Sequence, residues 1–188
     1  MQSQRNNTVV ASVWVSLDGF ASDAPDEQMS WVTDDFGPEL GEWGVQQMRA
    51  MDTLLLGRVT YDIMAAYWPD AGEEEGEFTA LMNDTPKVVI SQSLRPEQIA
   101  WQNTRVAPGA LAEEVSALEG TVGVTGSIDL TRSLIGGCLL DRLHLLVHPV
   151  VLGGMGGKRM FGGYEQTGMR LVDTAVLDGR VARLTYEP

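Results

Sequence analysis

Apolar residues follow short alternating runs along this chain, and these runs predict the strands of a sheet. Residues 9–17 carry apolar side chains at every second position, from Val9 to Leu17, which is typical of a strand with a buried face. Short apolar runs bounded by turn residues are typical of buried strands in a parallel sheet. Such runs predict further strands at residues 53–56, 87–91, 121–125 and 143–151.

Between these runs, apolar residues recur three or four positions apart, which predicts amphipathic helices. The first helix is predicted to begin at a cap formed by Asp34 or Asp35, with Pro38 in its first turn. Its apolar stripe consists of Leu40, Trp43, Met48 and Met51. Further helices are predicted at residues 60–67, between Gly109 and Gly120, and at residues 128–135.

The C-terminal part of the chain predicts a hairpin. Residues 171–177 and 181–186 flank Asp178-Gly179, a strong signal for a tight hairpin turn. Strands that alternate with helices favour an α/β fold with a mainly parallel central sheet and helices on both faces. No repeat or linker divides the chain, so we predict one domain over residues 1–188, with an ordered core over residues 9–187.

Composition excludes several partners. Lys and Arg total 13 against 26 Asp and Glu, and the net charge of −13 repels nucleic acid and anionic membranes. The N-terminus has no apolar signal segment, and no apolar run reaches the roughly 20 residues of a membrane helix, so we predict a cytoplasmic protein. Cys138 is the only cysteine, which rules out an intrachain disulfide, and its apolar neighbours predict a core position.

Familiar nucleotide and metal motifs are missing from the sequence. No G-x-G-x-x-G follows the first strand, and residues 153–158 are too short for a P-loop. His144 and His148 are four residues apart on a predicted strand, which separates them by roughly 13 Å. We therefore expect both histidines to have structural roles.

Two turns from strand to helix are better candidates for chemistry. Gly57 is followed by Arg58 and Thr60 after one strand, and Gly126 by Ser127 after another. The amides at a helix N-terminus suit a phosphate, glycine allows its close approach, and arginine pairs with it bidentately. Because open α/β sheets bind ligands at the carboxyl edge of their strands, two such turns on one edge suit the two phosphate regions of a dinucleotide.

The same segments resemble dihydrofolate reductases. Residues 57–61 (GRVTY) resemble the G-R-x-T-[WY] turn of that family. Residues 88–91 (VVIS) resemble its next strand, whose serine meets the adenosine end of NADPH, and residues 125–127 (TGS) resemble its second glycine turn. The resemblance implies a dihydrofolate reductase-like fold with NADPH as the cofactor.

A closer resemblance is to the reductase domain of the bifunctional riboflavin-biosynthesis deaminase–reductases. It runs from about Val9 to the C-terminus and rests on the order and spacing of five segments. They are residues 16–19 (SLDG), 30–33 (SWVT), 139–143 (LLDRL), 148–153 (HPVVLG) and 158–161 (KRMF).

These resemblances imply a set of site residues. The implied cofactor contacts are Trp31, Gly57, Arg58, Thr60, Ser91, Thr125, Gly126, Ser127, Ile128, Asp129 and Leu130, with Arg132 at the end of the second turn. Asp18 and Gly19 are expected near the nicotinamide and the substrate, with Asp18 orienting the substrate. Asp34 and Asp35 are further catalytic candidates, and Lys158 brings positive charge to the substrate pocket.

Some family features are absent. The zinc motifs of the deaminase half are missing, Val124 stands where the riboflavin reductases have an acid, and Arg49 is the only arginine on the first helix. The prediction is therefore an NADPH-dependent reductase of a small heterocyclic, pyrimidine- or pterin-like substrate, related to 5-amino-6-(5-phosphoribosylamino)uracil reductase. Dihydrofolate reductase activity and a non-catalytic nucleotide-binding or regulatory protein are the alternatives, and a homodimer is expected because symmetric dimers are common.

Overall fold

The computed structural model describes residues 5–23, 29, 31–32, 37–72 and 76–188 of the chain. Asp34 and Asp35, two of the three predicted catalytic residues, lie outside the described residues. Within the described part, no helix is both long and apolar enough to span a membrane.

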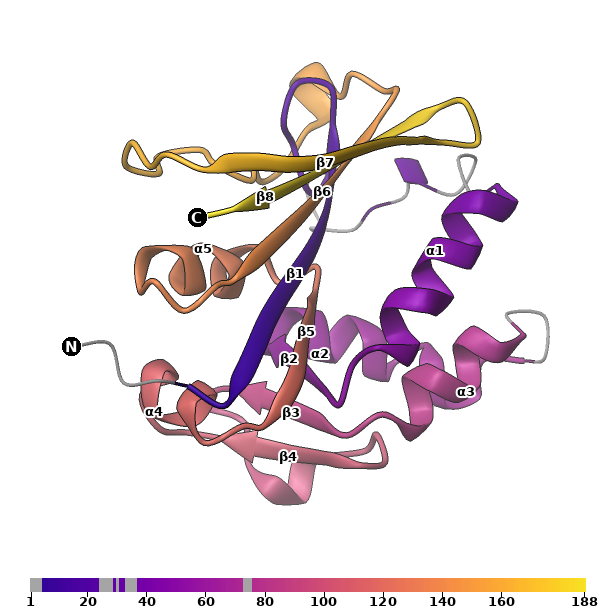
Figure 1. Ribbon diagram of the computed structural model, residues 1–188. Coiled ribbons are helices and arrows are strands. Elements are labelled where there is room, and N and C mark those ends of the chain that lie inside the picture. Colours follow the sequence, from indigo (N-terminus) through magenta and orange to yellow (C-terminus); the bar gives the residue numbers. More distant parts are fainter. Residues whose placement is uncertain (1–4, 24–28, 30, 33–36, 73–75) are drawn as a thin grey trace.

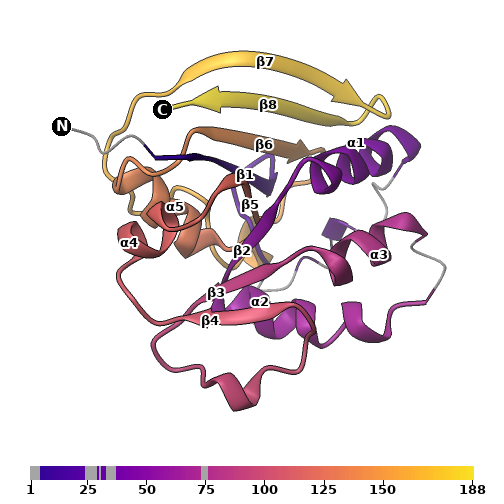
Figure 2. The same cartoon turned by 60° about the horizontal axis from the view of Figure 1, so that its bottom comes forward.

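One eight-stranded sheet forms the centre of the molecule (Figures 1 and 2). Its strands are β1 (Asn7–Ser16), β2 (Thr53–Gly57), β3 (Lys87–Ile90), β4 (Thr104–Ala107), β5 (Gly120–Thr125), β6 (Arg142–His148), β7 (Arg170–Leu177) and β8 (Val181–Glu187). Their order in the sheet is β4-β3-β2-β5-β1-β6-β8-β7. The first six strands in this order are parallel, whereas β8 pairs antiparallel with both β6 and β7. The predicted fold class is confirmed.

Helices cover both faces of the sheet. They are α1 (Pro38–Arg49), α2 (Arg58–Ala65), α3 (Glu77–Asp84), α4 (Leu111–Ser116) and α5 (Ile128–Gly136), with 3-10 turns η2 (Trp68–Asp70), η4 (Pro96–Gln98) and η5 (Gly153–Met155). Helices α4 and α5 pack on one face, and α1, α2 and α3 pack on the other (Figure 2). The alternation of β1 explains this division, since Val9 and Ala11 face α4 and α5 while Ser12 and Trp14 face α1.

The sequence did not predict α3 or β4. Helix α3 has eight residues and fully buries only Met82, while β4 has four residues and lies at the edge of the sheet. The end of α3 is held by Lys87, which is 1% exposed and donates from Nζ to the carbonyl oxygens of Met82, Asn83 and Thr85. A buried lysine thus closes the C-terminal end of α3, where its charge also suits the helix dipole.

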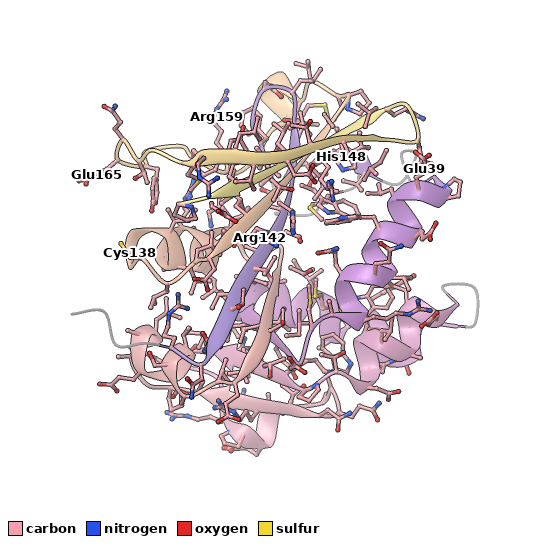
Figure 3. The ribbon with its side chains drawn as sticks, in the orientation of Figure 1. Glu39, Cys138, Arg142, His148, Arg159 and Glu165 are labelled. Atoms are coloured by element: carbon pink, nitrogen blue, oxygen red, sulfur yellow. The ribbon has the colours of Figure 1, made fainter. Side chains whose placement is uncertain are left out.

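The predicted cap of the first helix is wrong. Helix α1 begins at Pro38, and Gly37 rather than Asp34 or Asp35 is its N-cap residue. The capping carboxylate comes from the turn of the C-terminal hairpin, because Asp178 accepts hydrogen bonds from the amides of Glu39 and Leu40 at 3.0 and 2.9 Å. In Figure 3, Glu39 lies at the start of α1, close to that turn.

The predicted hairpin is confirmed, but the predicted core position of Cys138 is wrong. Asp178 and Gly179 both have positive φ, 52° and 66°, as a type I′ turn between twisted strands requires. Cys138 follows the end of α5 with a φ of 53° and is exposed (Figure 3). It belongs to the turn that carries the chain from α5 towards β6 at the surface.

Candidate nucleotide-binding cleft

The two glycine turns lie side by side and are hydrogen-bonded to each other. Strands β2 and β5 are parallel neighbours, so both turns leave the same edge of the sheet. The amide of Gly57 donates to the Ser127 hydroxyl at 3.0 Å, and the amide of Ser127 donates to the Thr60 hydroxyl at 3.1 Å. The predicted meeting of the two turns at one edge is therefore present in the structure.

The second turn has a tightly constrained backbone. Gly126 and Ser127 both have positive φ, 64° and 51°, a conformation that is unfavourable for serine. Ser127 occupies the N-cap position of α5, yet its side chain makes no capping bond to that helix. Its hydroxyl instead accepts from Gly57, so the contact between the turns holds the strained residue in place.

Helices α2 and α5 both begin at this edge. The first amides of a helix have no partner within the helix, and together with the helix dipole they attract anions. In α5 these amides belong to Ile128, Asp129 and Leu130. At the start of α2, the Arg58 Nε lies 2.6 Å from an oxygen of Asp62, one turn further along the helix.

A large cleft of about 1420 Å³ extends from these turns. Eleven predicted site residues line it: Gly57, Arg58, Thr60, Ser91, Thr125, Gly126, Ser127, Ile128, Asp129, Leu130 and Lys158. Ser91 directly follows β3, and its hydroxyl accepts from the amides of Ser93 and Leu94. Among the described residues, Asp18, Gly19, Trp31 and Arg132 are predicted site residues that do not line the cleft.

Asp18 holds a neighbouring loop in place. Its carboxylate accepts from the Ser16 hydroxyl at 2.7 Å and from the amides of Leu152 and Gly153 at 3.1 and 2.9 Å. The hydrogen bond from Ser16, and then those from Gly153 and Leu152, lower the pKa of Asp18 to about 2, so the side chain is ionised near neutral pH. Gly19 has a φ of 82° in the same turn.

Trp31 and the two histidines pack behind the cleft. Trp31 meets the His148 ring edge-on, with 5.4 Å between ring centroids, and Trp14 contacts the same ring at 5.2 Å. His144 lies beside Trp43, and its Nδ1 is 3.0 Å from the Thr185 hydroxyl. Both histidines are buried, in keeping with the structural roles expected of them. Among the described residues, no group of three or more His, Cys, Asp or Glu could hold a metal ion.

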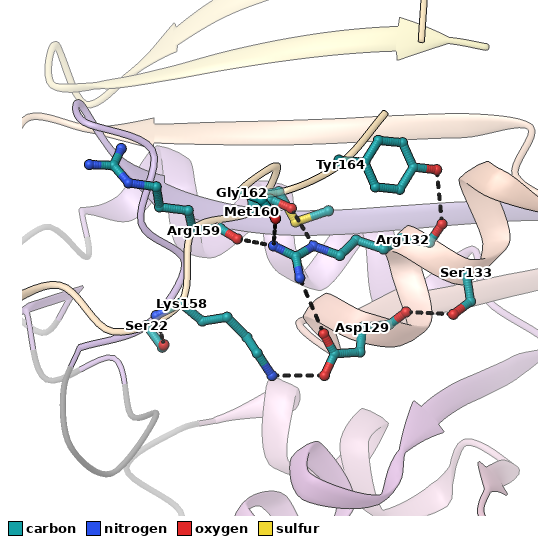
Figure 4. A network of polar contacts seen from close by, with 9 residues as sticks. All are labelled: Ser22, Asp129, Arg132, Ser133, Lys158, Arg159, Met160, Gly162 and Tyr164. Atoms are coloured by element: carbon teal, nitrogen blue, oxygen red, sulfur yellow. Dashed lines mark hydrogen bonds and ion pairs between the residues drawn. The ribbon is translucent and has the colours of Figure 1, made fainter. Parts of the chain in front are cut away.

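Lys158 reaches the cleft from a loop that α5 holds (Figure 4). The Arg132 guanidinium donates to the carbonyl oxygens of Arg159, Met160 and Gly162. Asp129, in the first turn of α5, pairs with Lys158 at 2.7 Å and with Arg132 at 3.4 Å. Arg132, implied as a cofactor contact, thus holds the loop that presents Lys158.

The sequence missed the side of the cleft formed by α1, α2 and α3. Examples of its lining residues are Ser12, Trp14, Trp43, Met48, Met64 and Phe78. One signal was present, since Ser12 and Ser16 interrupt the second face of this strand, which also carries Val10 and Trp14. That signal had no meaning until the helix opposite Ser12 was known.

The order of the sheet, with its antiparallel C-terminal hairpin and a cleft at the carboxyl edge of the parallel strands, defines a dihydrofolate reductase-like α/β protein. A family model, the RibD C-terminal domain, matches residues 7–182. The chain belongs to this family, which confirms the resemblance seen in the sequence.

Individual proteins are similar to the chain over nearly its whole length. The uncharacterised protein YyaP of Bacillus subtilis (strain 168) is 27% identical over 189 residues, which cover 97% of this chain and 95% of YyaP. A protein of Shewanella sp. PV-4, provisionally assigned to riboflavin biosynthesis, has a crystal structure with a TM-score of 0.76 and 19% identity, covering 96% of this chain and 98% of its own. Dihydrofolate reductase of Enterococcus faecalis, solved with NADP(H), has a TM-score of 0.61 and 15% identity, covering 96% and 95%.

Proposed function

We propose that this protein is an NADPH-dependent reductase that transfers hydride to a small heterocyclic, pyrimidine- or pterin-like substrate. The observation that carries the proposal is the pair of glycine turns joined by the Gly57–Ser127 and Ser127–Thr60 hydrogen bonds at one edge of the sheet. This arrangement brings the N-termini of two helices to one cleft. The family to which the chain belongs supports the same function.

The residues present fit a nicotinamide dinucleotide. The first amides of α2 and α5 would hold its phosphates. Arg58 and Lys158 are the cations among the described lining residues, and they offset part of the net charge of −13. When bound, NADPH supplies the hydride, and the protein supplies position and charge.

The proton donor is the open part of this proposal. Among the described lining residues Asp129 is the only carboxylate, and Lys158 engages it. Asp18 is ionised and turned towards the loop at Leu152, which suits a positioning role better than proton donation. Asp34 and Asp35 therefore remain the candidates that the resemblance to dihydrofolate reductases suggests.

Calorimetric titration with NADPH and with NADH tests the cofactor. We expect NADPH to bind more tightly, and we expect Arg58→Ala to weaken NADPH binding about tenfold, equivalent to about 1.4 kcal/mol, through loss of a charged contact to phosphate. Arg170→Ala is the matched control, because Arg170 is an exposed, ion-paired arginine on β7, the last strand in the sheet order and not a neighbour of β2 or β5. A protein that binds neither nucleotide would refute the proposal.

Substrate turnover separates the reductase from its alternatives. Oxidation of NADPH with a pyrimidine or pterin would support a reductase, and turnover of dihydrofolate would identify a dihydrofolate reductase. Binding of NADPH without oxidation across pterins, pyrimidines and quinones would indicate a non-catalytic nucleotide-binding protein instead. We also propose that the protein is cytoplasmic and forms a homodimer. Sedimentation of the purified chain measures the oligomeric state directly.

A further inference from the structure

The cleft has two chemically different halves. The half at the glycine turns contains Arg58, Asp129 and Lys158, which are the charged side chains among the described lining residues. The other half lies against α1, α2 and α3. Its lining is mostly apolar and aromatic, with Trp43, Met48, Met64, Tyr67 and Phe78 as examples.

Arg49, the arginine of α1, does not contribute its charge to this second half of the cleft. Arg49 donates from Nε and from a terminal nitrogen to the two carboxylate oxygens of Glu77, at 2.7 and 2.5 Å. Its side chain is 57% exposed and is not part of the lining. His144, behind Trp43, is also unsuited to an anion, because burial keeps it neutral by lowering its pKa to about 4. A phosphate in this half would therefore meet no cation of the described lining.

Two buried polar atoms in the same half lack partners within the described structure: the Ser12 hydroxyl and the Trp43 indole N–H. The two residues are only 6% and 9% exposed, and both line the cleft. They flank the same histidine, since Ser12 is opposite His144 in the β1–β6 register and the Trp43 ring packs edge-on against it at 5.5 Å. Ser12 is also opposite Thr125, so it stands where the two halves meet.

Buried polar groups are normally hydrogen-bonded, so two orphaned ones in a cleft indicate where a ligand presents its polar edge. The indole N–H only donates, whereas a hydroxyl both donates and accepts. A carbonyl oxygen, with a ring N–H or a second carbonyl beside it, satisfies both. The apolar walls suit a flat body without charge.

Resting on the proposed function, we infer that the helical half of the cleft takes an uncharged, planar heterocycle with a carbonyl edge and no phosphate group. Its polar edge meets Ser12 and Trp43, and its body lies among the methionines and aromatic rings. The substrate class thus differs from the phosphoribosyl compound after which 5-amino-6-(5-phosphoribosylamino)uracil reductases are named.

A matched pair of probes tests this inference. Riboflavin and riboflavin 5′-phosphate share one planar ring with a carbonyl edge and differ in the phosphate alone. Binding to the full chain is followed by quenching of the flavin's own fluorescence. We expect riboflavin to bind at least about tenfold more tightly. Equal or tighter binding of the phosphorylated compound would overturn the inference, as would failure of both to bind at concentrations up to about 1 mM.

Variants then test the two anchors. Trp43→Phe keeps an aromatic ring and removes the N–H together with part of the indole, and Ser12→Ala removes the hydroxyl. Each is expected to weaken riboflavin binding about threefold to tenfold while NADPH affinity stays within about twofold. Ser116→Ala, on α4 at the other face of the sheet, is the control for removal of a serine hydroxyl. Unchanged riboflavin affinity in both anchor variants would overturn the anchoring role.

A third variant adds the missing charge. Gln47 lines the cleft from α1, and Gln47→Arg is expected to tighten binding of riboflavin 5′-phosphate about fivefold and to leave riboflavin unchanged. No gain for the phosphorylated probe would count against the inference. A separate NADPH titration keeps the two proposals apart. If NADPH does not bind but the protein still discriminates between the two flavins, the proposed cofactor is refuted. If NADPH binds but the protein does not discriminate between the flavins, the inferred substrate class is refuted.

Discussion

His144 is buried beside the Thr185 hydroxyl, and its ionisation is therefore linked to folding. Burial, and then the nearby Arg183 and Arg142, lower its pKa from 6.5 to about 4, while Asp173 acts in the opposite direction. The unfolded chain binds a proton on this histidine below about pH 6.5, whereas the native protein does so only near pH 4. Acid therefore favours the unfolded chain across this range.

We predict that this single group removes about 3 kcal/mol of stability as the pH falls from about 6.5 to about 4. His144→Gln is expected to be less stable than the wild type at about pH 7, because it loses the Trp43 contact, but to depend less on pH. Urea unfolding of both proteins at about pH 7 and about pH 5 measures the difference, in which the shared carboxylates cancel. Parallel pH profiles would show that His144 is not the group responsible.

Through its hydroxyl, Ser127 accepts one of the two hydrogen bonds that join the glycine turns. Removing its hydroxyl leaves the Gly57 amide without its 3.0 Å partner, in a part of the cleft where the backbone must keep a fixed shape. We predict that Ser127→Ala lowers the free energy of unfolding by about 1 kcal/mol and weakens NADPH binding about fivefold to tenfold. Urea unfolding and calorimetry measure the two effects, with Ser116→Ala as control. An unaltered affinity for NADPH would mean that the turn keeps its shape without this bond.

At the scale of the element, α1 is anchored by the opposite end of the chain. Asp178 lies 139 residues beyond Glu39, yet its carboxylate accepts from the first free amides of α1. Gly37 is required beside it, because a Cβ at this position would lie 2.2 Å from the Asp178 carboxyl carbon. The hairpin turn thus fixes the start of the helix that forms one wall of the cleft.

Replacing the capping residue separates the cap from the turn. Asp178→Gly keeps the positive φ of the turn and removes the carboxylate, and we predict a loss of about 1 kcal/mol in the free energy of unfolding. Asp178→Asn tolerates the same backbone and keeps an oxygen acceptor, so it is expected to lose less. Equal stability of the aspartate and glycine forms in urea would show that α1 does not need this cap.

Element by element, most of the fold follows from local pattern. The parallel strands, the hairpin at Asp178-Gly179 and the apolar stripes of α1 and α5 are visible in the sequence, because each depends on the spacing of nearby residues. Helix α3 and strand β4 are not visible, because both are short, and the hydrogen bonds from Lys87 that close the end of α3 appear only in the folded protein.

At the scale of the whole molecule, ligand binding and folding are linked. A ligand that binds only the native state stabilises it by about 2.7 kcal/mol at about 100 times its Kd. For a chain of this size, each kcal/mol added to the free energy of unfolding raises the thermal midpoint by about 2–4 °C. We therefore predict that NADPH raises the midpoint by about 5–10 °C. Thermal unfolding with NADPH, and with adenosine alone as control, measures the shift. An unchanged midpoint at high NADPH would contradict binding to the folded protein.

The sequence by itself determined most of the strands and helices, the hairpin, and the two glycine turns at the carboxyl edge, because periodicity and turn chemistry are local properties of a chain. Only the tertiary structure decided what the polar residues do. Asp18 holds the loop at Leu152, Asp178 caps α1, and Ser12 and Trp43 face a shared apolar space. Whether a carboxylate, a hydroxyl or an indole N–H is available to a ligand depends on whether a group from a distant part of the chain hydrogen-bonds to it. Only the tertiary structure brings such groups together.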